Sequence, residues 1–282
     1  MSVSDKYAEQ RRYYVEEVAA VAGLRSAPLL QALGQVRREA FLPPGPWHIE
    51  SVDGGYYPTD DVAVPRILHA VGVCLDLRRG LNSGNPARIC RLLEAIEILP
   101  GETVLHVGAG LGYYSALIAL LVGREGRVIA AEVDPLFRRQ AEKNLAPLGN
   151  VTVVADAQSM PLPPLDVVFA SAGMASIPRL WTDPLRPGGR LSLPLTGALD
   201  YGYVFLFQKT DAPSRYHGRR CHFSRYFPCL GLRDLADMQA LDAALPDRRI
   251  DQARRLTLRL DPHEYDSACW LHRPDYCIGL EM

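Results

Sequence analysis

The chain of 282 residues lacks a long apolar run. Its longest, around residues 116–122, falls well short of the roughly 18 apolar residues that a membrane-spanning helix needs. The first residues, MSVSDKYAEQRRYYVEE, also lack the apolar core of a secretion signal. A formal net charge of −1, with both signs mixed along the chain, gives no reason to expect nucleic-acid binding through bulk charge. These absences predict a cytoplasmic protein that binds neither membrane nor nucleic acid.

CxxC pairs are also absent, although the chain contains six cysteines: Cys74, Cys90, Cys221, Cys229, Cys269 and Cys277. Four of them lie in the last quarter of the chain, near four histidines: His217, His222, His263 and His272. Their spacings match no zinc pattern, and buried free thiols are common in cytosolic proteins. We therefore expect no metal site.

A regular alternation of apolar runs and helical segments begins at residue 103. The expected strands are TVLHV, RVIAAEV, VTVVAD, LDVVFAS, GRLSLPL and YGYVFLFQ, and the helices between them include GLGYYSALIALLVG and PLFRRQAEKNLAPLG. Such an alternation predicts a parallel sheet that is covered by helices on both faces. The fold class is therefore a doubly wound α/β domain over roughly 85–235, whose ligands bind at the carboxyl ends of the central strands.

The residues before this alternation are expected to form helices and loops. We predict helices over 4–22 and 28–41, and a third helix that starts at Pro86 with Asn85 as its N-cap. The segment 45–80 is dense in Gly, Pro, Asp and Tyr, which is typical of functional loops or disorder. The expected division of the chain is 1–84, 85–232 and 233–282.

The turn ETVLHVGAGLGYYSA raises the question of which ligand it binds. A phosphate-binding P-loop needs Lys followed by Ser or Thr, and this chain has Tyr113 and Tyr114 there. Gly108, Gly110 and Gly112 form GxGxG, and Tyr113 stands where a dinucleotide-binding turn needs its third glycine. S-adenosylmethionine remains, because its methionine part needs close backbone approach but carries no pyrophosphate.

Acids follow the next two strands. Glu132 comes twenty residues after Gly112, where a carboxylate accepts hydrogen bonds from ribose hydroxyls. Asp156 follows the third strand and is placed to accept from an adenine amino group. The structural alternatives are an exposed strand-end acid for Glu132 and a helix N-cap for Asp156.

Several segments resemble the protein-L-isoaspartate O-methyltransferases. They are LLQALGQVRREAFLPP, VLHVGAGLGYYSALIALLVG, VIAAEVDP, AEKNLAPLGNVTVVADA, FASAGMASIP, LRPGGRLSLPL and SRYFPCLG, within residues 28–232. The resemblance implies a seven-stranded, Rossmann-like methyltransferase sheet with an N-terminal helical cap, closed by a strand at 224–231. It implies S-adenosylmethionine as cofactor, and methyl transfer to an isoaspartyl carboxylate whose ester collapses to a succinimide.

Carried onto this chain, the resemblance implies one set of cofactor-binding positions: His106, Gly108, Ala109, Gly110, Gly112, Glu132, Val133, Asp156, Ala157 and Ser171. Ser171, with Ala172 and Gly173, would lie under the reacting methyl group. His106 is a departure, because methyltransferases usually carry an acid there. A neutral imidazole still accepts one hydrogen bond, and a core histidine is the alternative.

A second departure concerns the methyl acceptor. In the family, a Ser two residues before a Pro supplies a hydroxyl to the acceptor carboxylate. Here the segment GLNSGNP puts Gly84 at that position and Ser83 one residue earlier. We predict that Asn82, Ser83 and Asn85 act as the catalytic donors. The alternative is that they only shape a turn and cap a helix.

The third departure is the segment 233–282, which lies beyond the family core and is expected to contain a helix, a basic linker and one or two strands that extend a sheet edge or line the acceptor pocket. Taken together, the three departures from the family pattern favour a carboxyl O-methyltransferase that tailors a specific peptide or small-metabolite carboxylate. The alternatives are an isoaspartyl repair enzyme and a non-catalytic cofactor- or peptide-binding protein. A nucleic-acid methyltransferase is disfavoured, since SAGMASIP replaces an NPPY-like tetrad. The oligomeric state does not follow from the sequence.

Overall fold

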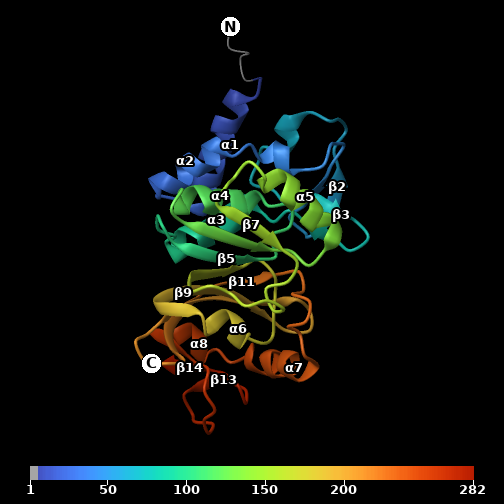
Figure 1. The fold of residues 1–282 in the computed structure, drawn as a ribbon. Coiled ribbons are helices and arrows are strands. Elements are labelled where there is room, and N and C mark those ends of the chain that lie inside the picture. Colours follow the sequence, from blue (N-terminus) through green and yellow to red (C-terminus); the bar gives the residue numbers. More distant parts are fainter. Residues whose placement is uncertain (1–5) are drawn as a thin grey trace. The chain divides into compact units, whose positions relative to one another are not determined.

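A computed structural model describes residues 6–282, which form two compact units (Figure 1). Unit 1 contains the residues up to 101, 109–127 and 134–153, and unit 2 contains 102–108, 128–133 and 154–282. Each unit is described by itself. No helix in the described part of the chain is long and apolar enough to cross a membrane. The cytoplasmic location stays a prediction.

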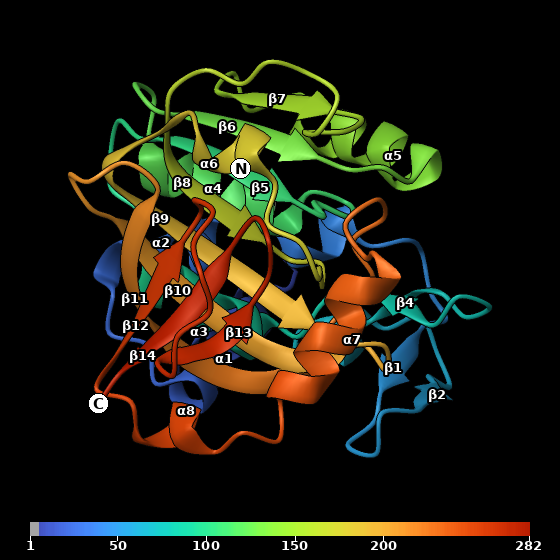
Figure 2. The same ribbon diagram turned by 90° about the horizontal axis from the view of Figure 1, so that it is seen from below.

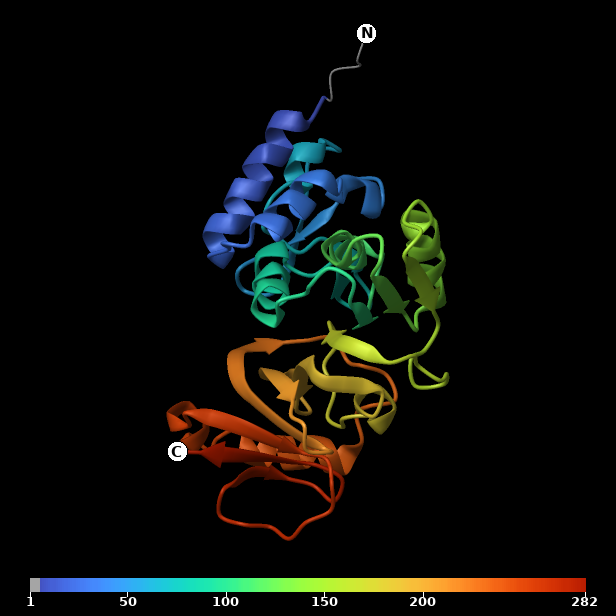
Figure 3. The same cartoon turned by 60° about the vertical axis from the view of Figure 1, so that its left-hand side comes forward.

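Unit 1 is built mainly from helices (Figure 3). They are α1 (Ala8–Ala22), α2 (Ala27–Gln35), α3 (Pro86–Ile96), α4 (Tyr113–Val122) and α5 (Pro135–Leu145), with the 3-10 turns η1 (Arg38–Phe41) and η2 (Val64–Ile67). Helix α1 packs against α3, and α2 packs against α4. The predicted start of the third helix is confirmed, because the Asn85 side chain caps α3 and Pro86 is its first residue.

The single helix expected over 28–41 is wrong. Helix α2 ends at Gln35, Val36 and Arg37 are extended, and a 3-10 turn begins at Arg38. The side chain of Arg38 is only 2% exposed and donates to the backbone carbonyls of three residues, Ile67, His69 and Val71. A straight helix gives up its regular hydrogen bonds here because these carbonyls, which are buried or partly buried, gain a charged donor.

The segment 45–80 is folded rather than structureless. It contributes the antiparallel pair β1 (His48–Glu50) and β2 (Tyr56–Pro58), the turn η2, and β3 (Cys74–Asp76), which pairs with β4 (Leu81–Asn82). Strand β4 leads directly into the segment that was expected to serve the acceptor.

The main sheet has ten strands among the described residues. In chain order they are β5 (Thr103–Val107), β6 (Arg127–Ala131), β7 (Val151–Val154), β8 (Leu165–Ala170), β9 (Leu185–Thr196), β10 (Tyr201–Lys209), β11 (Arg215–Arg225), β12 (Arg255–Arg259), β13 (Cys269–His272) and β14 (Cys277–Glu281). Their order across the sheet is β13-β14-β12-β11-β10-β9-β8-β5-β6-β7. Strand β8 is parallel to both of its neighbours, β5 and β9. From β9 to the sheet edge, each of the neighbouring pairs β9–β10, β10–β11, β11–β12, β12–β14 and β14–β13 is antiparallel.

The predicted doubly wound methyltransferase sheet is confirmed, with β5 to β11 as its seven strands. The last of them lies at 215–225, so the closing strand expected at 224–231 is misplaced. Pro228 has no N–H for a strand ladder. Its neighbours Phe227 and Cys229 instead bond Gly173, at 2.7 Å each, in the loop after β8.

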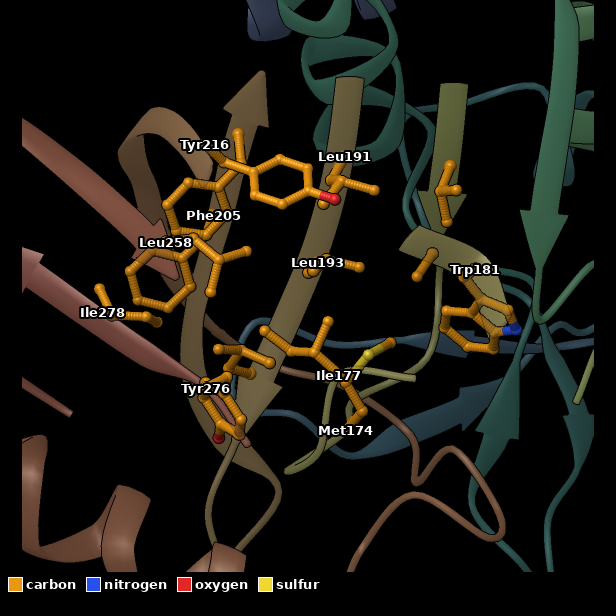
Figure 4. Packing of buried hydrophobic residues seen from close by; sticks show 14 of the residues in the cluster. Met174, Ile177, Trp181, Leu191, Leu193, Phe205, Tyr216, Leu258, Tyr276 and Ile278 are labelled. Carbon is orange, nitrogen blue, oxygen red and sulfur yellow. The ribbon is translucent and has the colours of Figure 1, made fainter. Parts of the chain in front are cut away.

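The segment 233–282 adds helix α7 (Leu235–Ala244), the short helix α8 (Arg249–Gln252) and three strands at the sheet edge (Figure 2). Figure 4 shows side chains from this segment packed with those of the preceding strands. Leu258, Tyr276 and Ile278 are at most 1% exposed, beside Phe205 and Tyr216. The segment extends the sheet edge, as expected, but with three strands rather than one or two. Its side chains complete one hydrophobic core in unit 2.

Candidate functional site

The carboxyl ends of the central strands bring most of the predicted cofactor residues of unit 2 to one edge of the sheet. The Gly108 N–H donates to the carbonyl of Ala131 at 3.0 Å, and the Ser171 N–H donates to the carbonyl of Val107 at 2.8 Å. The Glu132 N–H likewise donates to the carbonyl of Val154 at 3.0 Å. We call the following residues the strand-end shelf: His106, Gly108, Glu132, Val133, Asp156, Ala157 and Ser171.

Glu132 is the most buried acid of the shelf, with 7% of its surface exposed, whereas the neighbouring Val133 is 44% exposed. An acid that follows the second strand of such a sheet is placed to accept hydrogen bonds from ribose hydroxyls. The negative charges of the shelf acids also act on the thiol of Cys229, a residue that the sequence analysis did not assign to the site. Burial raises its pKa to about 12, and the negative charges of Asp156 and Glu132 contribute to that shift.

Asp156 lies in a turn, and its carboxylate accepts a hydrogen bond from the Gln158 N–H at 2.8 Å. No helix begins there among the described residues, so the turn replaces the N-cap that was the structural alternative. Within the described residues the second carboxylate oxygen makes no hydrogen bond, so a ligand can use it. Ala157 beside it is buried, so its backbone is the part nearest a ligand edge.

His106 is completely buried in β5. Its Nε2 lies 3.1 Å from the hydroxyl of Ser171, which is only half-buried. Burial lowers the pKa of His106 to about 3, so the ring is neutral at physiological pH. His106 is therefore a core histidine, as one of the two interpretations expected, and its Nε2 contacts Ser171. Its use as a hydrogen-bond acceptor toward the cofactor stays a prediction.

The glycine turn starts with Gly108 in unit 2 and continues with Ala109 to Gly112 in unit 1. Its tightness comes from the Gly112 N–H, which donates to the Ala109 carbonyl at 2.9 Å. Gly112 has a φ of 93°, and a Cβ there would lie 2.8 Å from the Leu145 side chain. Gly110 has a φ of 57°, and apart from its two chain neighbours no described residue comes within 4 Å of its Cβ position. An open, left-handed glycine lets a ligand reach the backbone.

The segment Asn82–Pro86 of unit 1, which we call the 82–86 loop, contains the predicted catalytic donors. The hydroxyl of Ser83 accepts from the Val73 N–H at 3.0 Å and lies 3.4 Å from Arg38 Nη2. Its own hydrogen points to the Gly84 carbonyl at 3.3 Å. That last bond is long, so this hydroxyl can be redirected to a stronger acceptor at small cost.

Asn82 and Asn85 are held more tightly. Asn82 donates to the Tyr56 hydroxyl and accepts from the Gly84 N–H, both at 2.8 Å. Asn85 caps α3 through its side-chain oxygen and donates its amide to the Ala70 carbonyl at 2.6 Å. The structural alternative, a turn and a helix cap, describes both side chains.

Gly84 has a φ of 74°, a conformation that side-chain-bearing residues rarely adopt. A Cβ at this position would lie 3.3 Å from the ring of Tyr114. The Tyr114 hydroxyl in turn donates to the Gly84 carbonyl at 3.1 Å. The local backbone therefore disfavours a serine at the position where the family resemblance expects one.

Sequence reasoning missed three residues that hold this loop: Arg38, Tyr56 and Tyr114. Arg38 reaches Ser83, Tyr56 links Asn82 to the Gly80 carbonyl at 2.8 Å, and Tyr114 holds Gly84. Two of them lie in the quoted motifs VRREAFLPP and GYYSA, so the signal was present. Which backbone groups they bind is a tertiary property, which those motifs do not encode.

The residues present fit an adenosyl ligand, judged within each unit. An open glycine backbone allows close approach, a buried acid suits ribose hydroxyls, and a turn acid suits an adenine edge. The chain differs from the family pattern at His106, where the neutral imidazole brings no negative charge toward an ammonium group.

Comparisons with known proteins agree with this chemistry. Residues 70–233, more than half of the chain, match the family model described as "Protein-L-isoaspartate(D-aspartate) O-methyltransferase (PCMT)". A protein-L-isoaspartate O-methyltransferase of Aeropyrum pernix is 31% identical over 234 residues, which cover 81% of this chain and 82% of the relative.

Two solved structures share the fold. A protein-L-isoaspartate O-methyltransferase matches with a TM-score of 0.65 at 20% identity, covering 96% of this chain and 88% of its own. A Plasmodium falciparum protein of the same type, solved with S-adenosyl-L-homocysteine, matches with a TM-score of 0.61 at 13% identity, covering 77% and 97%. The predicted fold, enzyme class and methyl donor are confirmed: this is an S-adenosylmethionine-dependent methyltransferase, and the chain belongs to the protein-L-isoaspartate O-methyltransferase family.

Proposed function

We propose that this enzyme methylates the side-chain carboxylate of isoaspartyl residues in peptides and proteins. The observation that carries the proposal is the continuous family match over 70–233, which takes in both the 82–86 loop and the glycine turn. Relatives that align with most of the chain bear the isoaspartate name. The substitution at Gly84 changes one donor within that framework.

The sequence analysis favoured a tailoring role on a specific peptide or small metabolite over isoaspartyl repair, and we now rank isoaspartyl repair first. That role was based on the missing serine and on the segment 233–282. The segment is part of the core of unit 2, so it needs no acceptor to account for it. Ser83 also supplies a hydroxyl one position before Gly84, where the family has its serine. Isoaspartyl repair, previously the alternative, is therefore the better supported acceptor class.

On the donor side, we assign the shelf and the glycine turn to S-adenosylmethionine, which supplies a methyl group on a sulfonium. Gly108, Ala109, Gly110 and Gly112 give the backbone approach to the methionine and ribose. Glu132 accepts from the ribose hydroxyls. A further group borders the adenine or the methyl group: Val133, Asp156, Ala157 and Ser171. His106 positions Ser171.

On the acceptor side, little acid–base chemistry is required, because a carboxylate is already ionised at neutral pH. The chain has to align one carboxylate oxygen with the methyl carbon, hold the other oxygen and exclude water. We assign the holding hydrogen bond to the Ser83 hydroxyl, whose present bond to the Gly84 carbonyl is long, at 3.3 Å. Asn82 and Asn85 shape the loop.

The test is methyl transfer from labelled S-adenosylmethionine to an isoaspartyl peptide, with the same peptide containing normal aspartate as the control. Selective labelling of the isoaspartyl peptide is the expected result. Calorimetric binding of S-adenosylhomocysteine in the same preparation verifies the donor site. If the cofactor binds and neither peptide is labelled, the isoaspartyl proposal is wrong, and metabolite or precursor-peptide carboxylates become the acceptors to screen.

A further inference from the structure

Four metal-ligating side chains meet in the last part of unit 2, away from the strand-end shelf in the sequence. They are His263, Cys269, His272 and Cys277, and their ligand atoms all lie within 4.8 Å of one another. The two sulfur atoms are 3.0 Å apart, and Cys269 Sγ lies 3.9 Å from His272 Nδ1. Two soft thiols and two imidazoles are a donor set that zinc prefers.

The hairpin of β13 and β14 explains how a spacing that matches no zinc pattern produces this cluster. His272 lies directly opposite Cys277 in the antiparallel pair, so their side chains share one face. Cys269 precedes His272 by three positions, which would normally put it on the other face. The register shifts between Cys269 and Leu271, and the extra residue of this bulge returns Cys269 to the shared face.

His263 completes the cluster from the loop that precedes the hairpin. Its Nδ1 donates to the Asp261 carbonyl at 2.9 Å, which leaves Nε2 as the nitrogen with a lone pair. This Nε2 is buried and has no hydrogen-bond partner within the described residues. A backbone carbonyl that fixes one ring nitrogen while the other faces a cluster is the usual outer contact of a metal-bound histidine.

We propose that His263, Cys269, His272 and Cys277 bind one zinc ion as a tetrahedral structural site. Zinc bonds of about 2.0–2.3 Å place ligand atoms about 3.3–3.8 Å apart, so movements of under about 1 Å suffice. Each thiol releases its proton to solvent on binding, and the resulting site is neutral. The expectation of no metal site relied on the spacing of these residues and on how common buried free thiols are, and neither argument takes account of the bulge.

A disulfide is the main competing chemistry for the two cysteines. Their sulfur separation of 3.0 Å is well above the bond length of about 2.05 Å. A Cys269–Cys277 disulfide would also leave Nε2 of His263 buried and unsatisfied, which is costly. The metal accounts for all four side chains together.

The position of this site suggests what the metal stabilises. Tyr276, the residue before Cys277, is buried and donates its hydroxyl to the Ala175 carbonyl at 2.6 Å. Ala175 lies in the loop that follows β8 and begins at Ser171. Zinc would therefore fix the hairpin and, through Tyr276, the loop that begins at Ser171 of the strand-end shelf.

The experiment measures zinc in the untagged full chain, expressed in zinc-supplemented medium and purified under reducing conditions. Elemental analysis is expected to find about one zinc per chain. The variant Cys269→Ser/Cys277→Ser should lose it, whereas the matched control Cys74→Ser/Cys221→Ser should retain it. Chelation should lower the Tm of the wild type and of the control.

A second measurement keeps the test decisive if the double variant fails to fold. Cobalt(II) exchanged into the wild type should give intense visible ligand-field bands and thiolate charge-transfer absorption. His263→Cys should keep a four-ligand site with a changed spectrum, and His263→Ala should lose affinity. Absence of both stoichiometric zinc and the cobalt spectrum in the wild type, or a Cys269–Cys277 disulfide found by mass spectrometry, would overturn the proposal.

Discussion

The strand-end shelf of unit 2 and the 82–86 loop of unit 1 achieve their geometry in different ways. In the shelf, backbone hydrogen bonds at the strand ends place the residues, and Glu132 and Asp156 follow the last residues of β6 and β7 by one and two positions. In the loop, side chains themselves hold the backbone: Asn82 and Asn85 bond local carbonyls and N–H groups. Polar residues therefore signal ligand binding more directly at strand ends than in a tight loop.

The largest expected effect tests whether the loop depends on side-chain bonds. Arg38→Met should lower the free energy of unfolding by about 3 kcal/mol, because three buried or partly buried carbonyls lose a charged donor. Denaturant unfolding measures this, with the exposed neighbour Arg37→Met as control. Equal effects of the two substitutions would show that the buried guanidinium does not hold the loop.

Glu132→Gln tests the shelf. Replacing the buried carboxylate should weaken S-adenosylhomocysteine binding by about 1–3 kcal/mol, the range for a buried hydrogen bond left unmade. Titration calorimetry measures the affinity, and Glu142→Gln, an exposed residue on α5, provides the control. Unchanged affinity in a folded Glu132→Gln protein would remove this residue from the donor site.

The pH dependence of stability tests the buried His106. Its folded-state pKa of about 3 lies below the ordinary value near 6.5, so the unfolded chain binds an extra proton between these values. Stability should therefore fall as the pH drops below about 6.5, with a contribution of up to about 1.4 kcal/mol per pH unit. Urea unfolding of wild type and His106→Gln measures it, and the variant should show the shallower slope. Identical slopes would contradict a neutral, buried ring.

Asn85 gives the smallest expected effect. Asn85→Ala should lower the free energy of unfolding by about 1 kcal/mol through loss of the α3 cap. Asn85→Asp keeps the capping oxygen and should recover much of that loss. Thermal unfolding of both variants makes the comparison. A larger loss for Asn85→Asp than for Asn85→Ala would mean that the hydrogen bond from the Asn85 amide to the Ala70 carbonyl, rather than the cap, determines the stability at this position.

The sequence predicted best what local patterns determine. Strands β5, β6 and β8 are short apolar runs next to glycines or helices, and the expected strands match them to within two residues at each end. Strand β11 was missed because RYHGRRCHFSR is polar and shows no apolar alternation. Its pairing with β10 and β12 stabilises it, and those contacts are distant in sequence.

Among the site residues, too, local patterns predict some positions, and distant contacts determine the others. Glu132 could be assigned by its place after an apolar strand, whereas the use of Asn82 and Asn85 within the loop depends on partners such as Tyr56 and Ala70. The break after Gln35 likewise depends on carbonyls near residue 69, which only the folded chain presents to Arg38. The cysteine and histidine cluster required a bulge that no spacing rule encodes.

One kinetic comparison tests the central claim, that the shelf serves the methyl donor and Ser83 serves the acceptor. It measures kcat/KM for an isoaspartyl peptide at saturating S-adenosylmethionine, together with S-adenosylhomocysteine affinity, for Ser83→Ala and Glu132→Gln. The account predicts that Ser83→Ala lowers kcat/KM about tenfold, the value of one charge-assisted hydrogen bond, with cofactor affinity unchanged. It predicts that Glu132→Gln chiefly weakens the cofactor. Unchanged kcat/KM in Ser83→Ala, or loss of cofactor affinity in that variant, would contradict it.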